Sequence, residues 1–158
     1  MIPGTAARAA ELEKRILASI PLARAMQLRI AHFDGERIAL VAPLEANIND
    51  KGTGFAGSLS ALVTIAGWSL ATLRGEECGE RCEAAVYRSE IDFLRPVREE
   101  LRAEAWVAVP GAVAGLHERL AAGRRAKLPV AARLGPAEDP AVNFAGNYAV
   151  WRVGTQPF

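Results

Sequence analysis

The segment spanning residues 58–74 constrains the fold of this chain most, because its pattern predicts a helix that is apolar on nearly every face. Such a helix is normally buried in a core or enclosed by a sheet. Gly75 follows it as a natural helix stop. The apolar run at 59–73 is shorter than the ~20 residues that cross a bilayer, and no secretory signal pattern opens the chain. We therefore expect a core helix in a soluble, cytoplasmic protein that does not interact with membranes.

The rest of the chain predicts a helix at residues 6–19, within an N-terminal segment 1–21 that Pro21 ends. An Asp-Gly pair at 34–35 predicts the bend of a hairpin. Four strands follow the apolar helix, and residues 112–122 fit either a short helix or a loop. A run of strands after a helix favours an antiparallel sheet in the α+β class. We expect five or six strands curled around the helix in one domain, residues 1–158. The predicted strands are 84–95, 99–109, 127–134 and 142–153.

The composition excludes several classes of protein. Apolar residues make up 51% of the chain and charged residues 23%, which is an ordinary globular balance and not that of a disordered chain. A net charge of +1 gives no sign of nucleic-acid binding. Two cysteines and two histidines cannot build a four-ligand zinc site without carboxylates. We expect no metal and no other cofactor, and Cys78 and Cys82 are better explained as loop thiols than as a redox pair.

The glycine-rich turn at residues 49–58 leads directly into the apolar helix. A turn of this kind leaves backbone N–H groups pointing outward at the positive end of the helix dipole. Such an end can hold an anion or stabilise a developing oxyanion. The alternative is plain helix capping, with Ser58 as the N-cap. The turn contains neither of the common nucleotide-binding glycine motifs.

The turn and its flanks also resemble a known family. Residues 43–59, Pro-Leu-Glu-Ala-Asn-Ile-Asn-Asp-Lys-Gly-Thr-Gly-Phe-Ala-Gly-Ser-Leu, resemble the signature of hot-dog-fold thioesterases, closest to the putative thioesterase domain also found fused to GNAT-type acetyltransferases (YiiD C-terminal family). Further matches lie at 20–26, 66–68 and 93–97. The resemblance implies a sheet wrapped around one long helix, a homodimer in which pairing into a tetramer stays open, and acyl-CoA or acyl-carrier protein as substrate.

The resemblance also implies roles for three residues. The wider pattern Asn-x-x-Gly-x-x-His-Gly-Gly begins at Asn49 and ends at Gly57, whose N–H would polarise the thioester carbonyl. The histidine of the pattern is Phe55 here. The acidic residue nine positions after that histidine in many relatives is Thr64, whose hydroxyl can orient water but cannot act as a base near neutral pH. We expect Asn49, Gly57 and Thr64 to form the catalytic centre.

Other side chains are candidates for binding the substrate, each with a structural alternative. Ser60 shares a helix face with Thr64, where it could hold a water or bond back to the carbonyl four residues earlier. Asp92 lies on the strand at 84–95, where it could reach a partner's helix end or face solvent. Ser89 resembles a serine of the family's strand motif. Asn47 could position the carbonyl, or form an Asx turn as Asn49 could. Phe55 and Ser58, in the turn before the helix, complete the set of expected substrate contacts.

Three functions follow. The first is hydrolysis of an acyl thioester, with the acyl chain near Phe55, Leu62 or Ile65. The second is a dehydratase, which the missing histidine disfavours. The third is a dimer that binds acyl thioesters without cutting them. Basic side chains near strand ends could bind the phosphates of the substrate's carrier, or be isolated surface charges; they are Arg95, Arg98, Arg124, Arg125 and Lys127.

Overall fold

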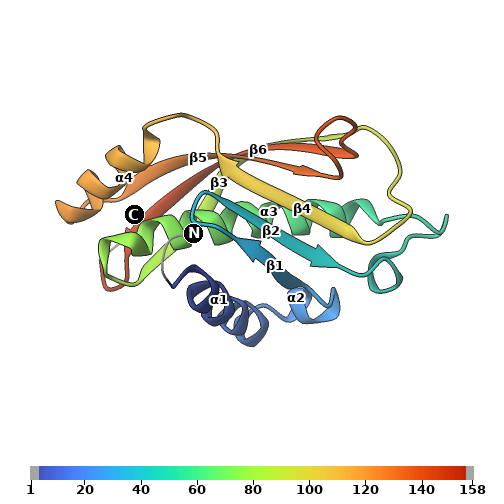
Figure 1. Ribbon diagram of the computed structural model, residues 1–158, viewed down its shortest axis with the longest axis horizontal. Coiled ribbons are helices and arrows are strands. Elements are labelled where there is room, and N and C mark those ends of the chain that lie inside the picture. Colours follow the sequence, from blue (N-terminus) through green and yellow to red (C-terminus); the bar gives the residue numbers. More distant parts are fainter. Residues whose placement is uncertain (1–3, 156–158) are drawn as a thin grey trace.

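A computed structural model describes residues 4–155 as one antiparallel sheet around a long helix (Figure 1). The six strands lie in the order β1-β2-β4-β5-β6-β3. Strands β1 and β3 therefore form the two edges of the sheet, and β6, the last strand along the chain, lies inside it. This confirms the expected α+β class and the antiparallel sheet. The elements are α1 (Thr5–Ser19), α2 (Pro21–Ala25), β1 (Arg29–Phe33), β2 (Arg37–Ala42), α3 (Ala56–Gly75), β3 (Cys82–Phe93), β4 (Leu101–Val107), α4 (Ala112–Ala121), β5 (Ala126–Leu134) and β6 (Val142–Arg152), with 3-10 turns η1 (Glu45–Asn47) and η2 (Glu76–Cys78).

Helix α3 is the centre of the core. Leu62, Val63, Ala66 and Leu70 have no exposed surface, and the helix contacts β2, β3, β4, β5 and β6. It is long and apolar enough to cross a membrane by composition, but here it is the packed core helix that its pattern predicts. The helix ends at Gly75 as expected and begins at Ala56, two residues before the predicted start.

The β1–β2 hairpin bends at the predicted Asp-Gly pair. Asp34 Oδ1 accepts hydrogen bonds from the backbone N–H groups of Arg37 (2.7 Å) and Glu36 (2.8 Å). The bond from Arg37 is the main cause that holds the pKa of Asp34 below its usual value. Gly35 has a φ of 101°, a conformation in which a side chain would be strained. Local chemistry therefore determines this turn.

Two helices lie outside the sheet. Helix α1 buries Leu12 and Ile16 beside β1, and α4 packs against β5 near the C-terminal end of α3 (Figure 1). The open choice for residues 112–122 is therefore resolved as a helix. Its buried side chains are Leu116 and Leu120, which are spaced for one helix face.

The strands differ in how clearly they are half-buried. Burial along β5 alternates strictly, as expected for a sheet with one face on a core. Strand β3 shows no such alternation, because it lies at the edge of the sheet and most of its residues after Ala85 are exposed. This edge runs beside the helix face that carries the candidate site.

Candidate functional site

The loop before α3 is built around Asn49. Its Oδ1 accepts hydrogen bonds from the N–H groups of Lys51 (2.8 Å) and Thr53 (3.0 Å), and its Nδ2 donates to the Thr53 hydroxyl (2.9 Å). The Asx turn proposed as the alternative for Asn49 is therefore present. The amide group of Asn49 is engaged inside the loop. Its role in catalysis stays a prediction, and in that role Asn49 would act by holding the shape of the loop.

Asn47 ties this loop to the preceding chain. Its Nδ2 donates to the carbonyls of Met26 (2.9 Å) and Pro43 (2.8 Å), and its own carbonyl accepts from the N–H of Phe55 (2.7 Å). The side chain is buried, and within residues 4–155 its Oδ1 has no hydrogen-bond partner. Asn47 thus fixes the residue that immediately precedes α3.

The N-terminus of α3 is open. Phe55 is the N-cap and its side chain cannot cap, so the N–H groups of the first turn are left without a side-chain acceptor in the described chain. This corrects the capping alternative, because Ser58 lies inside the first turn instead of at the N-cap. A Cβ on Gly57 would come within 2.5 Å of the Phe55 ring, which is 53% exposed. Glycine therefore lets the aromatic ring lie against the open helix end.

The half-buried face of α3 continues from this end through Ser60, Thr64 and Trp68. The Ser60 hydroxyl donates to the Ala56 carbonyl at 2.8 Å, which is the structural alternative predicted for it. The indole of Trp68 donates to the Ala84 carbonyl at 2.8 Å and so joins this face to the start of β3. Thr64 lies between them and is only partly buried.

A tyrosine contacts α3 at Thr64. The phenol of Tyr148 donates a hydrogen bond to the Thr64 carbonyl (2.7 Å). Burial raises the pKa of this phenol well above its usual range. A Cβ on Gly67 would lie 2.4 Å from the phenol oxygen. The glycine therefore allows Tyr148 to pack closely against α3 beside the candidate residue.

The candidates on β3 divide between two faces of the sheet. Ser89 pairs with the buried Gly146, on the face that covers α3. Asp92 pairs with the exposed Asn143, on the opposite face. Because side chains alternate along a strand, Ser89 lies on the helix side while Asp92 points away from the helix of its own chain. The structure thus places Ser89, not Asp92, beside the candidate helix face.

The remaining reactive side chains lie elsewhere. Cys78, in the connection after α3, and Cys82, the first residue of β3, are free thiols. Burial, reinforced by the nearby Glu76 carboxylate, raises the pKa of Cys82 to about 11. His117 bonds to the Arg74 carbonyl (2.8 Å) at the far end of α3. Within residues 4–155, no three potential metal ligands gather.

Sequence reasoning named most of these positions but missed Tyr148, which lies 84 residues from Thr64 along the chain. The signal that could have found it is Gly67, a glycine in the middle of an apolar helix. Such a glycine usually marks a close approach of another group.

Comparisons with known proteins agree with this geometry. Residues 9–152 match the family described as "Putative thioesterase (yiiD_Cterm)". A protein of unknown function from Chlorobaculum tepidum has 27% identity and a TM-score of 0.84, covering 91% of this chain and 94% of its own. A putative thioesterase from Shewanella oneidensis has 24% identity and a TM-score of 0.81, covering 90% and 96%. A thioesterase from Haemophilus influenzae has 17% identity and a TM-score of 0.68, covering 92% of both chains. The last two likenesses establish a common fold.

Proposed function

Because this chain belongs to the family described as "Putative thioesterase (yiiD_Cterm)", we propose that it hydrolyses the thioester bond of acyl-coenzyme A or of acyl-carrier protein. The observation that carries the proposal is the open N-terminus of α3, the 20-residue helix at the centre of the fold. Free thiols at Cys78 and Cys82 support a place in the reducing cytoplasm.

The first turn of α3 supplies the electrostatic part of the reaction. The thioester carbonyl accepts a hydrogen bond from the N–H of Gly57, and the helix dipole stabilises the negative charge that develops on its oxygen. Phe55 is exposed beside Gly57 and offers an apolar surface to the substrate. Loss of one such donor typically lowers the rate by about 10²–10³-fold.

Thr64 cannot serve the same thioester as the Gly57 of its own chain. The two residues are seven positions apart on one helix, which is about 10 Å along the axis at ~1.5 Å per residue. A water held by Thr64 therefore lies too far from a carbonyl bound at Gly57. We infer that each site combines Gly57 of one chain with Thr64 of a second copy.

The edge strand β3 supports a homodimer in which this happens. Val86, Tyr87 and Phe93 are all exposed along it, and an unpaired apolar edge strand is a template for another strand. Antiparallel pairing of two β3 strands centred near Ser89 would place Val86 opposite the partner's Phe93.

The half-buried side of α3 gives the acyl chain a path. Ile65 and Trp68 are partly buried there, whereas Leu62 has no exposed surface and is already packed in the core. We therefore place the acyl chain along Ile65 and Trp68, with Phe55 at the entrance. Of the three predicted contacts, Leu62 is the one that the packing makes inaccessible.

The test is release of free thiol from acyl-CoAs of short to long chain, with the wild-type protein and the Thr64→Ala variant. We expect turnover by the wild type and a clear loss in the variant. Unchanged turnover in the variant would keep the function but remove Thr64 from the site, and Ser89 would be examined next.

The alternative is a dimer that binds acyl thioesters without cutting them. The observation in its favour is that Phe55 and Thr64 stand where an imidazole and a carboxylate occur in many relatives. Tight acyl-CoA binding without thiol release, from both acyl-CoA and acyl-carrier protein, would establish it. A dehydratase stays disfavoured, because His117 is engaged at the other end of α3.

A further inference from the structure

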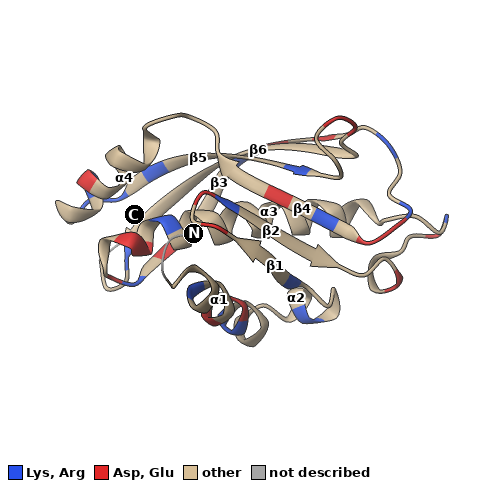
Figure 2. Cartoon of the chain, viewed as in Figure 1, with Lys and Arg blue, Asp and Glu red and all other residues tan. Residues whose placement is uncertain are grey.

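A basic groove lies between α4 and the start of β5. These two elements meet at the end of the molecule opposite the N-terminus of α3 (Figures 1 and 2). It has a volume of about 720 Å³. The uncharged residues that line it are Ala112, Gly115, Leu116 and Ala122, most of which have small side chains. The charged residues lining it are four cations and one carboxylate: Arg119, Arg124, Arg125, Lys127 and Glu118.

The turn after α4 holds this groove in shape. The Arg124 N–H donates to the Arg119 carbonyl (2.9 Å), and the Arg119 side chain donates through Nε to the Arg125 carbonyl (2.9 Å). Lys127 Nζ lies 5.4 Å from the centre of the Tyr87 ring. Among residues 4–155, neither Arg124 nor Lys127 forms a salt bridge. With four cations and one carboxylate, Glu118, the described lining of the groove has an excess of positive charge.

A second groove on the sheet shows that this excess is not general. It has a volume of about 560 Å³ and is lined by four arginines, but three glutamates line it too. Two of its arginines are already engaged, Arg95 with Asp139 (3.0 Å) and Arg133 with Glu104 (2.5 Å). The five basic residues suggested by the sequence are thus divided between the two grooves. In the α4–β5 groove the cations clearly outnumber the carboxylates, whereas in the second groove the two numbers are similar.

We propose that the α4–β5 groove binds the phosphate groups of the substrate's thiol carrier. The inference rests on the proposed function, because phosphates are the anionic groups common to coenzyme A and to the phosphopantetheine arm of a carrier protein. Arginine presents a planar fork that pairs with two phosphate oxygens, and lysine adds a point charge. The small residues of the floor leave room for a ligand between these side chains.

The sheet register places the groove next to a site completed by a second chain. Lys127 pairs with Ala149, and Ala149 pairs with Ala85 of β3. The other end of β3 approaches the N-terminus of α3, because the Gly54 N–H donates to the Val97 carbonyl at 2.8 Å. In the antiparallel dimer, the partner's open helix end therefore comes to the Ala85 end of β3. The groove of one chain flanks the thioester bound by the other.

The experiment compares three thioesters of one acyl group: its coenzyme A ester, its 4′-phosphopantetheine ester, and its N-acetylcysteamine ester, which has no phosphate. The variant is Arg124→Glu/Lys127→Glu. We expect kcat/KM for acyl-CoA to fall about tenfold or more, chiefly through KM, since charge-assisted contacts to phosphate are lost. Hydrolysis of the N-acetylcysteamine ester should not change.

A matched control is Lys14→Glu/Arg29→Glu, which changes the net charge equally at exposed positions outside the groove. It should leave all three substrates unaffected. A loss confined to acyl-CoA assigns the groove to the nucleotide phosphates, and a loss with both phosphorylated esters assigns it to the phosphate of the pantetheine arm. Equal losses with all three esters, or none with acyl-CoA, would overturn the proposal.

A binding measurement separates this inference from the proposed function. If the wild type releases thiol from none of the esters, calorimetric titration with coenzyme A and with adenosine 3′,5′-bisphosphate still tests the groove. Binding of coenzyme A that the double variant weakens about tenfold would support the groove without hydrolysis. Binding of equal strength in both proteins, or absent from the wild type, would refute it.

Discussion

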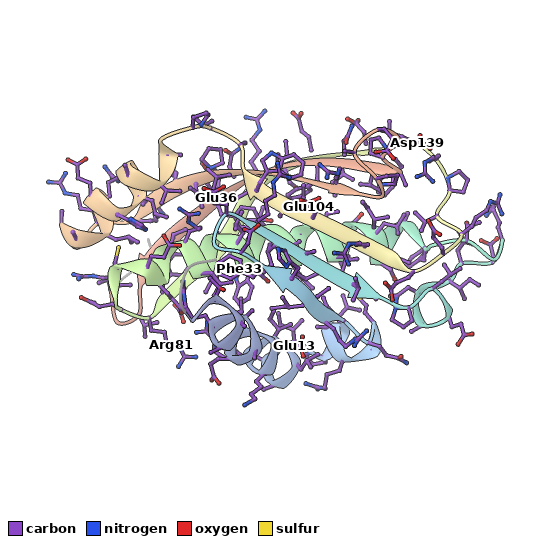
Figure 3. All side chains as sticks on the ribbon, in the orientation of Figure 1. Glu13, Phe33, Glu36, Arg81, Glu104 and Asp139 are labelled. Atoms are coloured by element: carbon purple, nitrogen blue, oxygen red, sulfur yellow. The ribbon has the colours of Figure 1, made fainter. Side chains whose placement is uncertain are left out.

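The two edges of the sheet are protected in very different ways. At β1, five residues long, helix α1 lies alongside and Glu13 accepts a hydrogen bond from the Ile30 N–H at 2.6 Å (Figure 3). A bulge between Ile30 and His32 also interrupts that strand. At β3, twelve residues long, the Trp68 indole covers the Ala84 carbonyl, and the strand beyond it is largely exposed.

The difference supports β3 as the edge that receives the second chain of the proposed homodimer. Helices, charges and bulges are the devices by which proteins prevent pairing at a sheet edge, and β1 has all three. Strand β3 also has a bulge, between Val86 and Arg88, and it carries charged side chains, but it is twelve residues long and its exposed apolar side chains present a surface that monomers rarely leave uncovered. The candidate residues of α3 lie beside the unprotected edge. The β1 edge of the sheet is thus covered within one chain, whereas the β3 edge is covered by a second copy in the proposed dimer.

The largest expected effect comes from charging the open edge. In Val86→Lys/Phe93→Lys, antiparallel pairing would bring like charges opposite one another, so the dimer should dissociate. Thiol release should fall roughly a hundredfold or more, the scale expected when catalytic groups are misplaced by about 1 Å. Light scattering and the thiol assay measure both changes.

The matched control charges the protected edge instead. His32→Lys alters an exposed residue of β1 and should change neither mass nor turnover. A dimer that survives the double lysine change, or dissociates with His32→Lys, would reverse the assignment of the two edges.

A second change disturbs the packing of α3 against the sheet, on the side of the molecule near β3. In Gly67→Ala, the new Cβ would meet the buried Tyr148 phenol, which donates to the Thr64 carbonyl. We expect the free energy of unfolding to fall by about 3 kcal/mol, from overpacking and a lost hydrogen bond. Denaturant titration measures it.

Gly115→Ala is the appropriate control, because that helical glycine of α4 has open space around it. There the alanine should stabilise by up to about 1 kcal/mol, through reduced freedom of the unfolded chain. Equal destabilisation by both changes would show that the contact with Tyr148 is not what matters.

A smaller effect is expected at β1. Glu13→Ala removes the carboxylate that accepts from the Ile30 N–H, and should cost about 1–2 kcal/mol of unfolding free energy. The dimer mass and thiol release should persist, since β1 is not the edge that pairs. Association of the variant through β1 into larger species would show that Glu13 also prevents pairing there, and loss of turnover would contradict the comparison.

The smallest effect concerns acid stability of the β1–β2 turn. The pKa of Asp34 is lowered in the folded state, so its charge contributes stability above about pH 4, the ordinary range of an aspartate, and loses it as pH falls through the lowered value. Solvent screens this partly exposed group, and the contribution should stay below about 1 kcal/mol.

Asp34→Asn tests this sign, because the amide oxygen can keep the turn while the charge is lost. The stability difference from wild type seen at pH 7 should shrink steadily as pH falls below about 4, the ordinary range of an aspartate. A difference that grows toward low pH would contradict the assigned direction.

Local and periodic signals in the sequence predicted much of the fold. The apolar pattern of α3 predicted a buried helix, and the Asp-Gly pair predicted the hairpin bend, because both depend on neighbouring residues. Strand order could not be derived this way. The placement of β3 at an edge depends on contacts between distant segments, and exposure along β3 removes the alternation that marks a half-buried strand.

The candidate site shows the same limit. The open helix end at Gly57 follows from a turn that can be read locally. The hydrogen bonds of Asn47 to Met26 and of Tyr148 to Thr64 join residues far apart in the chain, so no spacing rule could reveal them. The separation of Gly57 from Thr64 was implicit in helix geometry, and it is the reason why we propose that they act in one site from different chains.

The central claim is that one site uses Gly57 of one chain and Thr64 of the other. Mixing two inactive variants, Gly57→Val and Thr64→Val, tests it directly after subunit exchange confirmed by native mass spectrometry. A heterodimer then contains one site with both groups intact, so random exchange in a two-fold dimer should restore roughly a quarter of wild-type thiol release. Heterodimers that form and remain inactive would contradict the claim.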